Sequence, residues 1–134
     1  MNSASDKPIR YLTASDLYNI NNEVMNGDTL VRDLHLLSSA AHRPAISLFG
    51  QQQFPTLLDK AAALLHSMAY HHLFVDGNKR TAVRAVTAFL NLNGYDLTWT
   101  DDAEYPFVLE VAQGIHDVPQ IAQWLAQYVR PATE

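Results

Sequence analysis

The hydrophobic positions along the chain predict helices rather than strands. In the segment 55–72, apolar residues recur at three- and four-residue steps among residues that favour helices. The stripe consists of Leu58, Ala61, Leu65, Met68 and His72. Pro55 stands where this helix would begin, so His72 is expected to end its core-facing side. A second long helix, 79–93, is apolar on nearly all sides, as expected of a central helix, and Gly94 is suited to end it.

Shorter segments complete the pattern. Thr13 and Ser15 are candidate N-caps of a first helix, which the turn at 26–28 ends. Further helices are predicted at about 33–42, 102–113 and 118–129, and extended pieces at 45–54 and 95–100. The polar ends, about 1–10 and 130–134, are expected to be loose. The pattern therefore predicts one all-α domain over residues 1–134, with about six helices and one short β-like flap.

Composition and charge narrow the classes of function. The 134 residues are 48% hydrophobic and 17% charged, enough to bury a core. The net charge of −5 gives no basic footprint for nucleic acid, so a DNA-binding regulator fits poorly. The absence of cysteine excludes disulfides and thiolate metal sites. No apolar run is long enough for a membrane span or a signal peptide, which favours a cytoplasmic protein without a membrane partner.

The stretch "HLFVDGNKRT", residues 72–81, holds the candidate chemistry. Taken singly, its residues have ordinary explanations: a histidine at a helix end, a turn between helices, and two surface cations. Together they form a different pattern. The predicted helix after the turn offers unpaired N–H groups and a positive dipole end, yet its first turn contains the cations Lys79 and Arg80. A polyphosphate ligand would resolve this conflict, and Gly77 would let it approach the backbone closely.

Two further residues complete a candidate transfer site. The carboxylate of Asp76 suits Mg²⁺, which usually takes one or two carboxylates together with phosphate oxygens. His72 is suited to accept a hydroxyl proton near neutral pH. The residues alone therefore suggest transfer from a nucleotide to a hydroxyl, although no Walker A or other glycine-rich nucleotide motif is present. The remaining histidines do not have the spacing of a zinc site, and His71 is expected to face away from His72.

The stretch 72–81 resembles the signature of Fic/Doc proteins, most closely that of the death-on-curing (Doc) toxins of type II toxin–antitoxin modules. The resemblance extends over residues 42–97 and implies a Fic/Doc-like helical bundle. It also implies a general base at His72, an anchoring role for Phe74 and Mg²⁺ at Asp76. The implied ligands of the ATP phosphates are Gly77, Asn78, Lys79 and Arg80. A flap at about 45–50, near the active site, would align a target segment by strand addition.

Two positions in the motif indicate the reaction. Adenylylating Fic proteins usually have glycine at the position of Lys79 and arginine at the position of Val83. Arg84 lies about 100° further around the helix and cannot replace that arginine. Both departures match the Doc branch, whereas Gly77 is more typical of Fic proteins. The change of charge at Lys79 weighs more, because it lies inside the expected phosphate site.

The resemblance therefore implies a toxin kinase that transfers the ATP γ-phosphate to a translation factor, such as elongation factor Tu, and arrests protein synthesis. Two alternatives remain open: a Fic-type protein adenylyltransferase, and a catalytically degenerate helical module that binds an antitoxin. The family's inhibitory motif, Ser/Thr-x-x-x-Glu-Gly/Asn, has no match in the chain. Inhibition is therefore expected in trans, from a cognate antitoxin.

Overall fold

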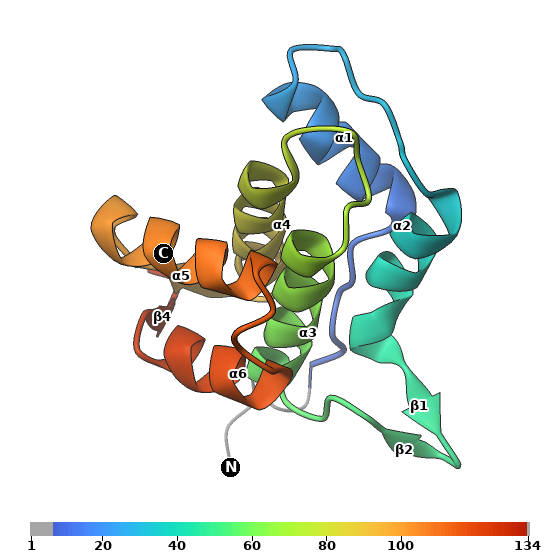
Figure 1. Ribbon diagram of the computed structural model, residues 1–134. Helices are drawn as coiled ribbons and strands as arrows, with labels where there is room; N and C mark the ends of the chain where they lie inside the picture. Colours follow the sequence, from blue (N-terminus) through green and yellow to red (C-terminus); the bar gives the residue numbers. More distant parts are fainter. Residues whose placement is uncertain (1–6, 134) are drawn as a thin grey trace.

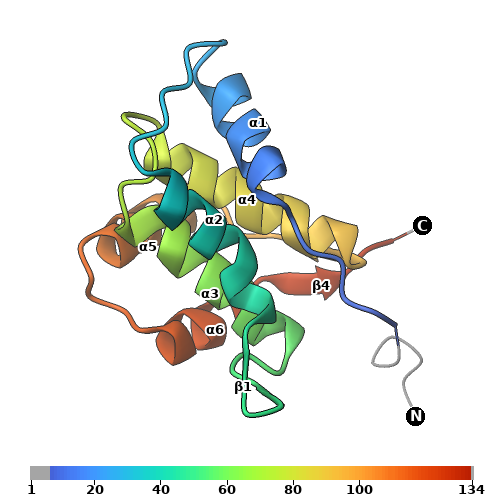
Figure 2. The same ribbon diagram turned by 90° about the vertical axis from the view of Figure 1, so that its right-hand side faces the viewer.

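Two antiparallel helices, α3 (Leu57–Tyr70) and α4 (Asn78–Leu92), form the centre of the fold (Figure 1). The computed structural model describes residues 7–133 of the chain. On one side of α3 lie α1 (Ala14–Val24) and α2 (Leu34–His42), and on the other lie α5 (Asp101–Ala112) and α6 (Val118–Ala126) (Figure 2). The expected all-α architecture with six helices is confirmed. No helix in the described residues has the length and apolarity needed to cross a bilayer.

Most of the helices begin at a side-chain cap, as the sequence predicted for the first helix. In each case the side chain of the N-cap accepts a hydrogen bond from a backbone N–H three residues later, which satisfies one donor of the first turn. The capping residues are Thr13, Asp33, Thr56, Thr100 and Asp117. The central helix α3 therefore begins after Thr56 and not at Pro55. The exception is α4, whose N-cap is a glycine without a side-chain bond.

The predicted flap is a β-hairpin. Its strands β1 (Ser47–Leu48) and β2 (Gln51–Gln52) pair antiparallel after a 3-10 turn, η2 (Arg43–Ala45). Phe49 and Gly50 connect them with φ values of 53° and 79°, as in the tight turns that match the twist of a hairpin. The hairpin joins the N-terminal end of α3, whereas the motif follows its C-terminal end (Figure 1).

The position of the hairpin differs from the expected place beside the active site. The 14 residues of α3 rise about 21 Å, so roughly a helix length separates the hairpin from the motif. A target segment paired with the hairpin would have to continue over the side of α3 to reach the motif.

A buried lysine fixes the base of this hairpin to α3. Lys60 is only 1% exposed, and its ammonium donates to the carbonyls of Pro44 and Phe54 and to the side chain of Gln52. It also lies 6.0 Å from the centre of the Tyr11 ring. Burial lowers the pKa of Lys60, and the nearby Asp59 partly offsets this. One side chain from the first turn of α3 thus binds the segments before and after the hairpin turn.

The C-terminal part of the chain corrects two expectations. The last helix ends at Ala126 rather than at 129, and β4 (Val129–Pro131) follows it and pairs antiparallel with β3 (Tyr95–Leu97). The Ala132 N–H also donates to the Gly94 carbonyl at 2.9 Å, so the chain is held rather than loose at least as far as this residue. The reason is tertiary, because β3 offers the backbone partners that the local sequence of β4 cannot supply.

The other end of the chain is also held. The backbone of Arg10 exchanges two hydrogen bonds of 2.9 Å with the side chain of Asn93. The rest of the expected loose N-terminus, residues 1–6, lies outside the described residues, as does residue 134.

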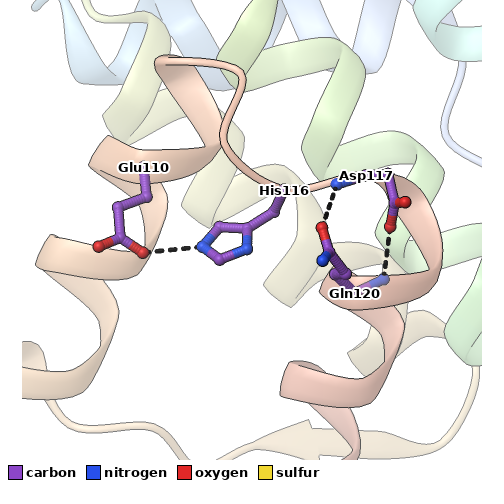
Figure 3. A network of polar contacts seen from close by, with 4 residues as sticks. All are labelled: Glu110, His116, Asp117 and Gln120. Atoms are coloured by element: carbon purple, nitrogen blue, oxygen red, sulfur yellow. Dashed lines mark hydrogen bonds and ion pairs between the residues drawn. The ribbon is translucent and has the colours of Figure 1, made fainter.

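The connection from α5 to α6 is fixed by polar side chains. His116 Nε2 lies 2.7 Å from Glu110 Oε1, which joins the loop to α5. Asp117 and Gln120 form a reciprocal cap at the start of α6 (Figure 3). His116 therefore has a structural role in the connection between α5 and α6.

Candidate active site

The candidate site begins where α3 ends. The helix stops at Tyr70, and His71 takes an extended conformation with φ −88° and ψ 140°. His72 therefore leaves the helix axis and is exposed. The prediction that His72 ends the core-facing stripe was wrong, because that stripe continues only to Met68. The prediction that His71 and His72 face apart agrees with the structure, in which they line separate cavities.

The loop that follows is pinned to the core. Phe74 is 1% exposed, as expected of an anchor. The side chain of Asn78 accepts from the Phe74 N–H at 3.0 Å and donates to the Phe74 carbonyl at 2.9 Å. These bonds give the Asn78 amide a structural role, so its contribution to a ligand would come mainly from its backbone N–H. The segment between α1 and α2 also holds the loop: the Val75 N–H donates to the Leu30 carbonyl, and the Arg32 N–H donates to the Leu73 carbonyl.

Gly77 is required by its surroundings as well as by its conformation. Its φ is 78°, in the left-handed region that favours glycine. A Cβ at this position would lie 2.9 Å from Met25 Sδ and 3.1 Å from Val24 Cγ1 on α1 and its end. The fully buried Asn21, also on α1, donates to the Asp76 carbonyl and to Thr81 Oγ1. Contacts with α1 and its C-terminal end therefore fix the turn at Gly77.

The first turn of α4 is open to a ligand. Within residues 7–133, the backbone N–H groups of Asn78, Lys79 and Arg80 have no acceptor, and the first helical hydrogen bond runs from Thr81 to Gly77. The side chains of Lys79 and Arg80 are exposed and form no ion pair in this part of the chain. Unpaired donors, a positive dipole end and two free cations together make an anion-binding site.

The expected catalytic residues surround one cavity of about 330 Å³. Its polar lining consists of His72, Asp76, Gly77, Asn78, Lys79 and Arg80, which is the complete set predicted from the sequence. Ala69 and Ala112 complete its wall together with Val75. The structure thus brings the His72 imidazole, the Asp76 carboxylate and the open end of α4 to one place.

A second cavity of about 410 Å³ continues past the same two cations, between α4 and α5. Val83 lines it, whereas Arg84 is exposed and lines neither cavity, as the helix geometry predicted. Tyr105 and Glu104 of α5 also line it. Burial raises the pKa of Glu104, and the neighbouring Asp101 adds to this.

The positions of two residues outside the motif were not predicted from the sequence. Nothing in the sequence indicated that Glu104 lies beside the motif, because α5 is distant in the chain. The buried Asn21 could have been noticed as a polar residue in the apolar face of the first helix.

The donors present fit a magnesium–nucleotide complex. One oxygen of Asp76 accepts the Gly77 N–H at 2.7 Å, which leaves the other oxygen available to a metal ion. In the described part of the chain, no group of three His, Asp or Glu side chains could hold a metal by itself. A cation at Asp76 would therefore complete its coordination with phosphate oxygens and water, as Mg²⁺ prefers.

The comparisons with known proteins agree with this geometry. The model of the Fic/DOC family matches residues 11–90, which include α1, the hairpin, α3 and nearly all of α4. A curated protein called "Toxin Doc", from Mycolicibacterium smegmatis, is 40% identical over 124 residues, covering 91% of this chain and 95% of its own length. The motif, the helical fold around it and these two matches show that this chain belongs to the Fic/DOC family.

Proposed function

We propose that the protein is the toxin of a toxin–antitoxin module and acts as an ATP-dependent protein kinase. Its acceptor would be a hydroxyl of a translation factor such as elongation factor Tu. The toxin assignment is supported by the 40% identity to a protein named "Toxin Doc" over nearly the whole length of both chains. The observation that most favours a kinase is the exposed Lys79 beside the open first turn of α4.

In this proposal, the polar groups that line the cavity bind the phosphates, hold the metal ion and accept a proton. The N–H groups at the start of α4 bind phosphate oxygens, and the side chains of Lys79 and Arg80 balance their charge. Asp76 would hold Mg²⁺, which when bound would reduce the repulsion between the phosphate groups and the incoming oxygen. His72 takes the proton of the acceptor hydroxyl. The hydroxyl oxygen bonds to the γ-phosphorus, the bond to the bridging oxygen breaks, and ADP leaves.

Adenylyl transfer is the second candidate, and Gly77 is the residue that favours it. The geometry of Gly77 weakens this argument, because the turn needs glycine for its φ of 78° and for the approach of α1, whichever phosphate reacts. At the position of the missing arginine, Val83 gives the second cavity an apolar wall. The cavity therefore has its cations only in the first turn of α4, which suits a phosphoryl group held there.

The expected partner is a cognate antitoxin that inhibits in trans. Wild-type protein should accordingly arrest growth when expressed alone and be tolerated when the antitoxin is expressed with it. The antitoxin should bring a segment that orders on binding and covers apolar surface of the toxin. Normal growth with abundant, folded protein and no partner would contradict the toxin assignment.

The reaction is tested by intact-mass measurement of candidate acceptors after incubation with ATP and Mg²⁺. One added phosphoryl group is the expected result, with label from γ-labelled ATP and none from α-labelled ATP. His72→Ala is the control, and loss of a positioned base should slow transfer by about 10²–10⁴-fold without loss of helical structure. An added adenylyl group would show that the protein is an adenylyltransferase and not a kinase. Full activity of a folded His72→Ala variant would remove His72 from the mechanism.

A further inference from the structure

A separate cavity of about 270 Å³ lies between α2, η2 and the C-terminal half of α3. It shares no residue with the two cavities at the motif. Ile46, directly before the hairpin, lines one part of it, and His71, directly before His72, lines another. The cavity therefore occupies the side of α3 between the hairpin and the candidate active site.

The principal polar group of this cavity is a half-buried arginine. Arg43 Nη1 donates to Ser67 Oγ at 2.9 Å and lies 3.0 Å from His66 Nδ1. Its guanidinium also lies 5.3 Å from the centre of the Phe54 ring. The Nη2 and Nε groups have no acceptor among residues 7 to 133, so one edge of the guanidinium keeps its donors available.

The charge of Arg43 is not balanced nearby. No acidic residue lines the cavity, and Arg43 has no carboxylate partner in the described residues. Burial lowers the pKa of His66, and the charges of Arg43 and His71 lower it further, against an opposing effect of Asp117. Asp117 itself caps α6 (Figure 3). The guanidinium therefore lies beside a ring that is neutral at pH 7, in a protein with a net charge of −5.

We infer that this Arg43 cavity is a recognition subsite for a carboxylate side chain of the protein acceptor. A guanidinium edge with free donors matches the two oxygens of a carboxylate, and the apolar wall formed by Leu36, Ala40 and Ile46 suits the methylene groups of Asp or Glu. The inference rests on the proposed transfer to a protein hydroxyl. His71 lines the Arg43 cavity and His72 faces away from it, so an acceptor segment with its hydroxyl at His72 would reach the Arg43 cavity by passing around the C-terminal end of α3.

A built-in carboxylate gives a direct test. Ser39 is exposed, lines the cavity and precedes Arg43 by four residues, so Ser39→Glu places a carboxylate where it can pair with the guanidinium. Ser38→Glu is the matched control, because Ser38 is exposed on the same helix and does not line the cavity. Both changes add one negative charge to α2 and leave the bonds of Arg43 to α3 in place.

Binding is measured without catalysis, by NMR titration of the side-chain resonances of Arg43, His66 and His71. The probe is N-acetylglutamate N-methylamide, and the uncharged match is the corresponding glutamine compound. The glutamate probe should shift these resonances saturably in the wild type and in Ser38→Glu, and not in Ser39→Glu. Equal shifts with both compounds, or no shift, would overturn the subsite. Stronger binding of inorganic phosphate than of the glutamate probe would overturn the carboxylate assignment.

The role in acceptor recognition is measured once an acceptor is identified by mass. Ser39→Glu should raise the KM for the acceptor protein by at least about tenfold, the effect of a lost charge-assisted hydrogen bond, and leave kcat and the KM for ATP unchanged. Ser38→Glu should match the wild type in all three. An unchanged acceptor KM in Ser39→Glu would refute the inference while leaving the kinase proposal intact. Failure of the kinase proposal, conversely, would leave the NMR result standing.

Discussion

Gly77 holds a left-handed conformation directly against α1, and the open helix end of the site depends on it. Two separate restraints act on this residue: a φ of 78° and the close approach of Met25 and Val24. The next residue, Asn78, closes the loop through the backbone of Phe74. At this scale, much of the motif therefore shapes the site. The side chains left to contact a ligand are those of His72, Asp76, Lys79 and Arg80.

Gly77→Ala should destabilise the protein more than Gly27→Ala. Both glycines have positive φ, and an alanine in that region costs about 1–2 kcal/mol. Only at Gly77 would the new Cβ also contact neighbouring atoms, since nothing lies within 4 Å of the corresponding point at Gly27. Urea unfolding of the two variants measures the difference. Equal losses of stability would show that Met25 moves aside without cost.

Lys79→Gly should reduce phosphoryl transfer by about 2–4 kcal/mol of transition-state stabilisation, as for other preorganised charged groups. The stability should fall by at most about 1 kcal/mol, because Lys79 is exposed in the first turn of α4. Arg84→Gly is the matched control: an exposed cation on the same helix that lines neither cavity at the motif. Steady-state transfer from ATP measures both. Unchanged phosphoryl transfer in a folded Lys79→Gly variant would contradict the kinase assignment and favour adenylyl transfer. The double variant Lys79→Gly with Val83→Arg would then test whether transfer of the α-phosphate becomes faster.

At the scale of elements, α3 connects two features that the sequence places only 20 to 25 residues apart. Lys60 in the first turn of α3 holds the hairpin, and the Arg43 cavity lies along the C-terminal half of the same helix. His72 follows the C-terminal end of α3. Most residues of α3 are buried, so the hairpin, the Arg43 cavity and His72 keep fixed positions relative to one another. The hairpin is the only one of them that extends away from the bundle (Figure 1).

Lys60→Met should loosen the hairpin without unfolding the bundle. The change keeps the length of the side chain and removes the donor shared by Pro44, Phe54 and Gln52, and a buried carbonyl left unpaired costs about 1–3 kcal/mol. Phe49 at the hairpin tip is fully exposed, so limited chymotrypsin digestion should cleave after it faster in the variant. Fragment masses identify the cut. Lys7→Met, at an exposed position, is the control. Equal rates in both variants would show that Lys60 does not hold the hairpin.

At the scale of the whole molecule, contacts distant in sequence complete the domain. The β3–β4 pair and the bonds between Arg10 and Asn93 bring the two chain ends to α4 and the strand that follows it. Partly buried ionisable groups between elements make the stability of this assembly depend on pH. His66 is the clearest case, because its environment is made by α3, η2 and the start of α6.

Acidification should destabilise the protein in part through His66. Its pKa is lowered in the folded state, so below the ordinary value of 6.5 the unfolded chain binds the proton first. The free energy of unfolding therefore falls as pH decreases from 6.5 through the folded pKa, by at most about 1.4 kcal/mol per pH unit for one proton. His66→Asn keeps an acceptor for Arg43 and cannot be protonated. Urea unfolding between pH 7 and 5 should show a flatter dependence in this variant, and an unchanged slope would contradict the assignment.

The sequence by itself determined the local structure and the members of the motif. Helix periodicity, capping residues and the Asp-Gly-Asn turn are properties of neighbouring residues, so six helices, a short extended flap and the set of residues from His72 to Arg80 could be predicted from it. Family membership followed from the same stretch and was confirmed by the comparisons.

Only the tertiary structure decided what distant elements do to this motif. The exposure of His72 depends on where the backbone of α3 turns away, and the need for glycine at Gly77 comes partly from α1. Strand β4 exists because β3 lies beside it, and the Arg43 cavity because η2 packs on α3. Each of these features depends on contacts between segments far apart in the chain, and a periodic pattern of hydrophobic residues specifies which face is buried without specifying what covers it.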